Sequence, residues 1–390
     1  MDLAKLRVDQ NGSLVAPQSL HDIFLRHEAG KASEQELTAA QDRAITEVIA
    51  RQQDVGLPIV CDGEFRRRNF QESFSRAVSG YEPPAQNLTR QEWHEPNNPL
   101  HRTEQNFNAA GPAIVTRRAV VEKLALQRNV ILDEYKFSAA RAKRPVKVSL
   151  IGPDRISQRF AWERSQSVYR DTDEFLADVV AIERRMITEL VAAGCRYVHV
   201  DAPGFTAYVD EVSLQRMRAR GEDPEQNLAR AIKAENAVIE GFPGVTFGLH
   251  ICRGNPRGVD PATGKVLPQW HREGHYDSIA ERLFGELKHH RLLLEYDSER
   301  AGSFAPLRFV RKSAIAVLGL VSTKTSELES KDALKRRIDE AAKYLPLAQL
   351  ALSPQCGFSS GVGEIQLAEQ HQWLKFGRIV ETAHDVWGSA

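Results

Sequence analysis

The chain has 390 residues, of which 42% are hydrophobic, and its 52 basic side chains balance its 52 acidic ones. This length can bury a large core, and a neutral chain without a basic cluster argues against binding to nucleic acid or to a membrane surface. No run reaches the ~18 to 20 apolar residues of a membrane span, and the first residues lack the apolar core of a secretion signal, so we expect a cytoplasmic protein. The four cysteines are too few and too scattered for a disulfide framework.

The N-terminal part of the chain predicts two short strands joined by a helix. A strand over residues 6–13 ends in Asn-Gly-Ser13, a turn sequence whose backbone can present hydrogen-bond donors. The helix over 33–55 opens with a Ser-x-x-Glu capping pattern. The apolar strand over 57–63 then delivers Glu64 and three arginines to one loop.

The rest of the chain alternates short apolar strands with amphipathic helices. Residues 80–112 interrupt this order, because they are rich in Pro, Asn and Gln and show neither period, so we expect an inserted hairpin or lid there. The β-branched and leucine-rich runs indicate parallel strands buried on both faces. The expected strands are 146–152, 197–201, 245–251, 291–296, 315–321 and 347–352, and the expected helices are 171–193, 223–240, 276–288, 305–312, 330–344 and 363–386.

Eight strands, counted with those near residues 7 and 59, favour an α/β fold of the (β/α)8 TIM barrel type with an insertion after the second strand. We expect residues 1–390 to form one such catalytic domain. The alternative is an open doubly wound sheet, but no Gly-rich phosphate-binding turn follows any strand. In a barrel the active site lies at the carboxyl ends of the strands.

Several of these strand ends carry residue types that bind metals. His250 and Cys252 lie two apart at the end of one strand and share a face, so both can point at one ion. Glu295 and Cys356, each placed where a buried strand gives way to a loop, are the candidates for the remaining ligands. Imidazole nitrogen, thiolate sulfur and carboxylate oxygen together suit zinc. The alternative is a core histidine beside an inert thiol, with Glu295 in an ion pair to Arg300.

Two thiolate ligands decide what such a zinc ion does. They place negative charge on the metal, so it generates hydroxide poorly and is well suited to binding an incoming thiol as a thiolate. We therefore expect alkyl transfer to sulfur. Glu295 is the ligand we expect to leave when the thiol arrives, which keeps the coordination number constant.

Three segments resemble the zinc-site motifs of cobalamin-independent methionine synthase: His-Ile-Cys-Arg-Gly-Asn, Leu-Leu-Leu-Glu-Tyr and Ser-Pro-Gln-Cys-Gly-Phe. The resemblance implies a Zn²⁺ cofactor on His250, Cys252, Glu295 and Cys356. It extends through Asn-Gly-Ser13, Asp-Gly-Glu64 and Val-Asp201-Ala-Pro to most of the chain, and it is to the catalytic barrel of these synthases. The chain looks like one of their short relatives, among which are epoxyalkane:coenzyme M transferases.

The resemblance also implies where the acceptor binds. The glycine-serine and acidic positions of the family hold the carboxylate and amine of homocysteine, so Ser13, Glu64 and Asp201 become candidate substrate-binding residues. We count Asp201 among the candidate catalytic residues as well, together with Glu295. The alternative is that Glu64 and Asp201 are ordinary ion-pair partners of nearby arginines.

Two departures from the synthase pattern concern the alkyl donor. Ala202 follows the strand-end Asp201, where the synthases have Glu. Lys324 stands nearest to the family's proton-donating His, so it is a candidate catalytic residue whose acid chemistry differs. Its alternative role is a loop ion pair with Glu327 or Glu329.

We expect a zinc-dependent methyltransferase of methionine biosynthesis that takes a 5-methyltetrahydrofolate-type donor and homocysteine as small-molecule partners. A different thiol is an alternative, as in the coenzyme M transferases. So are a metallohydrolase, which would favour His and Asp ligands, and a protein in which a closed zinc site only braces the fold. The oligomeric state is left open, a homo-oligomer included.

Overall fold

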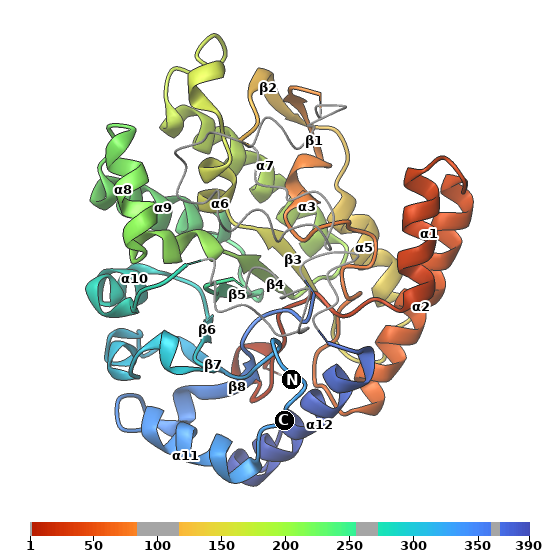
Figure 1. The fold of residues 1–390 in the computed structure, drawn as a ribbon, viewed down its shortest axis with the longest axis vertical. Coiled ribbons are helices and arrows are strands. Elements are labelled where there is room, and N and C mark those ends of the chain that lie inside the picture. Colours follow the sequence, from red (N-terminus) through yellow and green to blue (C-terminus); the bar gives the residue numbers. More distant parts are fainter. Residues whose placement is uncertain (1, 84–116, 255–271, 360–366) are drawn as a thin grey trace, which may run out of the picture.

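The computed structural model describes residues 2–83, 117–254, 272–359 and 367–390. A six-stranded sheet lies at its centre, with helices arranged around the strands (Figure 1). The strands are parallel and follow each other in chain order across the sheet. They are β3 (Lys147–Ile151), β4 (Tyr197–Asp201), β5 (Thr246–Ile251), β6 (Arg291–Glu295), β7 (Ile315–Val321) and β8 (Leu350–Pro354).

Every residue of these six strands is buried, from the first to the last position. Strands that are covered on both faces need apolar residues at successive positions, which explains why their sequences read as continuous runs. The parallel α/β architecture expected from the alternation of runs and helices is therefore confirmed. Since all six strands point the same way, their carboxyl ends meet at one edge of the sheet.

The two expected N-terminal strands are each reduced to a single parallel bridge. Val8 pairs with Leu352 of β8, and Val60 pairs with Val146 just before β3. The second segment has a physical limit, because Pro58 lacks a backbone N–H for a longer ladder. Both outer strands of the sheet thus have a neighbour from the N-terminal part of the chain.

Most of the expected insertion, residues 84–112, lies outside the described residues. On either side of the gap the chain forms an antiparallel pair, β1 (Val78–Tyr81) and β2 (Val120–Leu126), with an irregular register between Ser79 and Tyr81. This pair is separate from the central sheet. β1 begins before the segment 80–112 in which we expected a hairpin, and β2 lies after it.

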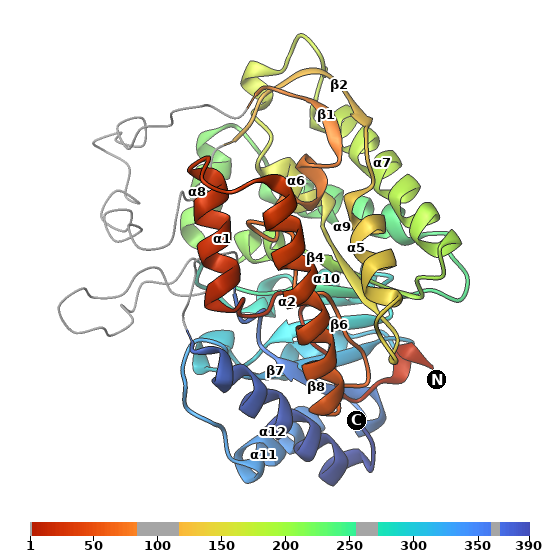
Figure 2. The same cartoon turned by 90° about the vertical axis from the view of Figure 1, so that its right-hand side faces the viewer.

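The long helices agree well with the sequence pattern. Ser33 caps α2 as expected, since its hydroxyl accepts from the N–H of Glu36 at 3.2 Å while the Glu36 carboxylate accepts from the Ser33 N–H at 2.7 Å. Figure 2 shows α1 and α2 packed side by side, and α11 beside α12. The helices are α1 (Gln18–Glu28), α2 (Glu34–Asp54), α3 (Glu72–Ser75), α5 (Val130–Ala139), α6 (Pro153–Gln158), α7 (Thr172–Ala192), α8 (Glu211–Ala219), α9 (Pro224–Ile239), α10 (Ala280–Glu286), α11 (Lys331–Ala341) and α12 (Glu369–Trp387).

Some helices differ from expectation. The segment expected as a helix at 305–312 is a short 3-10 helix, Ala305–Phe309, which contains Pro306. Sequence reasoning missed α1, α6 and α8, which are short or strongly polar. None of the described helices is long and apolar enough to cross a membrane.

Candidate metal centre

Three of the four predicted metal ligands meet at the carboxyl edge of the sheet. His250 is the second-to-last residue of β5, Cys252 follows that strand, and Cys356 follows β8. One ring nitrogen and the two sulfur atoms lie within 4.8 Å of one another. His250 and Cys252 are buried, whereas Cys356 is partly exposed. One imidazole and two thiols at this spacing are a donor set that fits zinc.

Asp201 orients the imidazole of His250. The register of β4 on β5 sets these two residues side by side, and His250 Nδ1 donates to Asp201 Oδ1 at 2.9 Å. Because Nδ1 then carries the proton, Nε2 is the nitrogen left for a metal. Carboxylates commonly hold metal-binding histidines in this way.

A second histidine, which sequence reasoning missed, supports the same carboxylate. His199 is fully buried on β4, and its Nε2 lies 3.2 Å from Asp201 Oδ1. Lys147 Nζ is 3.4 Å from the other ring nitrogen, so Nδ1 accepts and Nε2–H donates. The signal was present in the sequence, because His199 and Asp201 are two apart in a strand and share a face.

The three candidate ligands strongly affect one another's protonation. The Cys356 thiol donates to the Cys252 sulfur, and with the charge of His250 this lowers the pKa of Cys252 to about 6 despite burial. The same contact raises the pKa of Cys356. Burial opposes a charge on His250, but the Cys252 thiolate and Asp201 outweigh it and raise its pKa to about 9. A metal that binds here must therefore displace protons from His250 and Cys356.

Glu295, the predicted fourth ligand, is held by three donors. Its Oε1 accepts from Arg300 Nη2 at 2.7 Å and from Lys324 Nζ at 2.8 Å, and its Oε2 accepts from the backbone N–H of Arg253 at 2.5 Å. Burial raises the pKa of Glu295, but Lys324 and Arg300 outweigh it and bring it to about 2. The ion pair with Arg300 is therefore present, and metal binding by Glu295 stays a prediction.

Lys324 is part of the site, not of the loop pair considered from sequence. It is 5% exposed, and its Nζ also lies 3.1 Å from Asp297 Oδ2. Glu329 pairs instead with Lys375 at 3.0 Å. Two carboxylates thus stabilise the ammonium of Lys324, next to the metal-site residue Glu295.

Glu64 has an unusual backbone and an unpaired oxygen. It is the one non-glycine residue with positive φ, 62°, in the described part of the chain. Its Oε1 accepts from Arg67 Nη1 at 3.2 Å, while the buried Oε2 has no hydrogen-bond partner among the described residues. Burial, opposed by Arg67 and reinforced by Asp201, raises the pKa of Glu64 to about 8. Strain and an unpaired polar atom together are typical of a functional position.

Ser13 lies against the segment that carries Cys356. A Cβ on Gly357 would come within 2.5 Å of Ser13 Oγ, so the two segments pack closely here. The carbonyl of Ser13 accepts from the N–H of Phe358 at 2.9 Å. The structure thus brings the predicted substrate-binding serine close to the candidate metal ligands.

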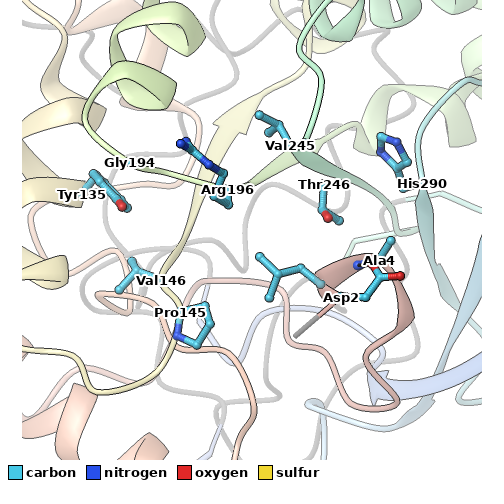
Figure 3. A pocket seen from close by; sticks show the side chains of 12 residues that line it. Asp2, Ala4, Tyr135, Pro145, Val146, Gly194, Arg196, Val245, Thr246 and His290 are labelled. Atoms are coloured by element: carbon cyan, nitrogen blue, oxygen red, sulfur yellow. Dashed lines mark hydrogen bonds between the residues drawn. The ribbon is translucent and has the colours of Figure 1, made fainter.

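Two cavities differ in their relation to this centre. One of about 560 Å³ is lined by Val146, Arg196, Thr246 and His290, which stand at the starts of neighbouring strands (Figure 3). It lies at the end of the strands opposite to His250 and Cys252. The other, of about 710 Å³, is lined by residues that follow β3 and β4, among them Arg155 and Tyr208. The second cavity is on the side of the metal centre.

The fold and the site define a parallel α/β protein with a thiolate-rich candidate metal centre at the carboxyl ends of its strands. The family model for the catalytic domain of cobalamin-independent synthase matches residues 17–253, and the chain belongs to this family.

Relatives and solved structures match over nearly the whole chain. The uncharacterized protein YxjH of Bacillus subtilis is 32% identical, over 98% of this chain and 95% of its own. The methionine synthase of Pyrococcus abyssi is 24% identical, over 100% of this chain and 97% of its own. The structure of a B12-independent methionine synthase from Shewanella, in complex with selenomethionine, has a TM-score of 0.69 at 19% identity and covers 98% of this chain and 97% of that one. At this identity the structure supports the fold alone.

Proposed function

We propose that the protein is a zinc-dependent methyltransferase that moves a methyl group onto the sulfur of homocysteine, with a 5-methyltetrahydrofolate-type donor. The observation that carries the proposal is the meeting of His250, Cys252 and Cys356 within 4.8 Å at the carboxyl edge of the sheet. Membership of the cobalamin-independent synthase family supports the reaction class. Relatives named methionine synthase support the acceptor.

Zinc, when bound, supplies a Lewis acid that keeps a coordinated thiol deprotonated at neutral pH. His250, Cys252 and Cys356 would hold it, with Glu295 as the fourth ligand. Asp201 fixes the ring of His250 through the 2.9 Å hydrogen bond. Lys324, Arg300 and the N–H of Arg253 donate to the carboxylate of Glu295 and would stabilise it whenever it is not bound to the metal.

The acceptor's polar end fits beside this centre. Glu64 offers a buried oxygen without a partner in the described part of the chain, and a substrate ammonium would satisfy it. Asp201 is close enough to raise the pKa of Glu64, so a cation between the two carboxylates relieves their repulsion. Ser13, against Gly357, supplies a hydroxyl for the carboxylate of the acceptor.

We also propose that the central sheet is part of a closed barrel. The bridges of Val8 to β8 and of Val60 to the start of β3 place N-terminal segments on both outer strands of the sheet. We infer that these two segments complete an eight-stranded barrel around the site.

The experiment is a direct test of product formation. Zinc-loaded protein is incubated with homocysteine and a methyl-labelled methyltetrahydrofolate, and labelled methionine is measured by mass spectrometry. The cobalt-substituted protein provides a second reading, because a thiol that binds the metal changes its visible spectrum. Transfer to coenzyme M but not to homocysteine would select the alternative acceptor. No transfer and no spectral response to any thiol would refute the proposal.

Glu64 and Asp201 carry the same carboxylate group but are expected to act differently. We expect Glu64→Gln to raise the KM for homocysteine roughly 10- to 100-fold, because a charged hydrogen bond is lost, and to leave zinc bound. We expect Asp201→Asn to weaken zinc binding roughly 10- to 100-fold, because it holds a ligand in place. Competition with a chelator and steady-state kinetics separate the effects. Equal effects of both variants on zinc affinity would contradict the division of roles.

Lys324 tests the identity of the donor. Loss of the leaving pterin requires a proton, and general acid catalysis is worth ~10² to 10⁴-fold, so we expect Lys324→Met to lower kcat by that order with methyltetrahydrofolate. A sulfonium donor, which needs no acid, should be affected little. Lys375→Met is the control, because this lysine is also buried and ion-paired, to Glu329 at 3.0 Å. Equal losses with both donors would show that Lys324 only supports Glu295.

A further inference from the structure

Three arginines beside the metal centre are linked to one another by neutral amide oxygens. The side-chain oxygen of Gln71 accepts from Arg155 Nε at 3.0 Å and from Arg159 Nη1 at 2.8 Å. The side-chain oxygen of Gln158 accepts from Arg272 Nη2 at 3.2 Å and from Arg155 Nη1 at 3.4 Å. We call Arg159, Arg155 and Arg272 the arginine ladder.

The ladder lacks acid partners of the kind that Arg67 and Arg291 have. Arg67 pairs with Glu134 and Arg291 with Asp9, each at 2.7 Å. For the three ladder arginines, no ion pair within 4.0 Å exists in the part of the chain that the structure describes. Arg272 also donates to the carbonyl oxygens of Pro203 and Gly204. Because these acceptors and the two amides are all neutral, they leave repulsion among the three cations that a bound anion would remove.

The positive charges of the ladder arginines are therefore destabilised, and the pKa values of Arg155 and Arg159 are lowered. Burial and the neighbouring Arg272 and Arg159 lower the pKa of Arg155 well below its usual value. Burial brings the pKa of Arg159 to about 10. Asp154 acts on Arg155 and Arg272, and Asp210 acts on Arg272, but neither acid lies within ion-pair distance of these arginines in the described part of the chain. Asp154 accepts instead from Tyr208 at 2.8 Å and from Gln158 at 3.0 Å.

Two of the three ladder arginines line a cavity, and one of them connects to the metal centre through a hydroxyl. Arg155 and Arg272 line the cavity of about 710 Å³, which is the size of a pocket for a small organic molecule. Arg272 is 7% exposed, and its Nη1 lies 3.3 Å from Thr206 Oγ1. That hydroxyl donates in turn to the carbonyl oxygen of Cys252 at 3.0 Å.

We propose that Arg159, Arg155 and Arg272 bind the anionic groups, carboxylate, sulfonate or phosphate, of the alkyl donor. This rests on the proposed alkyl transfer. The acceptor's polar end is assigned to Ser13, Glu64 and Asp201, which leaves the ladder for the second substrate. The ladder carries three positive charges, so a donor with two or more anionic groups fits best.

The first test measures anion binding with inorganic sulfate as the probe, so it requires no catalysis. We expect sulfate to raise the Tm of the zinc-loaded protein by about 2 °C or more over sodium chloride of equal ionic strength. Arg155→Gln and Arg272→Gln should remove most of this rise. Without sulfate, Arg155→Gln should be at least as stable as the parent protein, because repulsion among the arginines is relieved. A purely structural role of Arg155 predicts lower stability and an unchanged response to sulfate.

Two further variants serve as controls for the sulfate measurement. Arg184→Gln is the matched control, because Arg184 contacts the carbonyl oxygens of Ala237 and Glu240, at 2.6 and 2.7 Å, and lies outside the lining of the cavity. It should keep the full response to sulfate. Arg155→Lys, which keeps the charge, should retain part of the response even if Arg155→Gln folds poorly. An unchanged response in Arg272→Gln and either Arg155 variant would overturn the subsite.

The kinetic arm identifies the substrate. With methyltetrahydrofolate as an anionic donor, Arg155→Gln should raise the KM for the donor roughly 10-fold or more and leave the KM for homocysteine unchanged. A rise confined to homocysteine would overturn the assignment to the donor. If the parent protein transfers no methyl group, the proposed function fails, while the sulfate arm still decides whether the ladder binds anions.

Discussion

Replacing Cys252 or Cys356 by serine is expected to abolish zinc binding and methyl transfer together. A serine hydroxyl is not deprotonated by zinc at neutral pH as a thiol is, so each change removes one of only two thiolates from the donor set. The loss of affinity should exceed the 10- to 100-fold that is typical of residues that merely orient a ligand, so we expect more than ~100-fold. Elemental analysis and competition with a chelator measure it.

The chain offers a matched control in Cys195. This cysteine is fully buried, and its sulfur lies 3.4 Å from the carbonyl oxygen of Tyr197, away from His250. Cys195→Ser therefore makes the same chemical change in a packed interior and should keep its zinc. Full zinc occupancy in both Cys252→Ser and Cys356→Ser would show that the proposed centre is wrong.

The sequence predicted the strands of the central sheet because their apolar runs are continuous. For β4 and β7 the expected and observed ranges coincide, 197–201 and 315–321. The segment at 57–63 is also largely apolar, yet it forms one bridge, as does the more polar segment at 6–13, because strand pairing depends on a partner and not on composition alone. The position of β1 and β2 outside the central sheet is likewise a tertiary property.

The candidate site was predictable to the extent that it depends on spacing along a strand. His250 and Cys252 share a face by periodicity, and Cys356 follows a strand end. The pairing of Asp201 with His250 depends on the register of β4 on β5, which no local pattern fixes. The same limit applies to Glu295, whose partners Arg300 and Lys324 reach it from separate loops.

A buried ion network lies at the amino ends of the strands, opposite to the metal centre. It leads to the largest expected effect on stability. Asp9 is fully buried and accepts from Lys147 Nζ at 2.9 Å, Arg291 Nε at 2.7 Å and the hydroxyl of Tyr197 at 2.5 Å. Asp9→Asn leaves two buried cations without a counter-charge. We expect a loss of about 3 to 5 kcal/mol in the free energy of unfolding at pH 7, measured by urea denaturation.

The sign of the pH dependence follows from the same contacts. Burial raises the pKa of Asp9, but Lys147 and Arg291 outweigh it and hold this pKa well below its ordinary value. A group whose pKa is depressed in the folded state stabilises that state fully above its unfolded pKa of about 4, and this contribution is lost progressively as the pH falls from that value to the folded pKa. The parent should therefore lose stability on acidification, and Asp9→Asn should lose less over the same range.

Asp2 provides the comparison that separates burial from charge. It also pairs with a lysine, Lys5 at 3.3 Å, but 56% of its side chain is exposed, so Asp2→Asn should cost less than about 1 kcal/mol. A loss for Asp9→Asn as small as that for Asp2→Asn would show that the buried cations find other partners. Because Lys147 also contacts His199, which supports Asp201, weaker zinc binding in Asp9→Asn would show that the network extends to the metal centre.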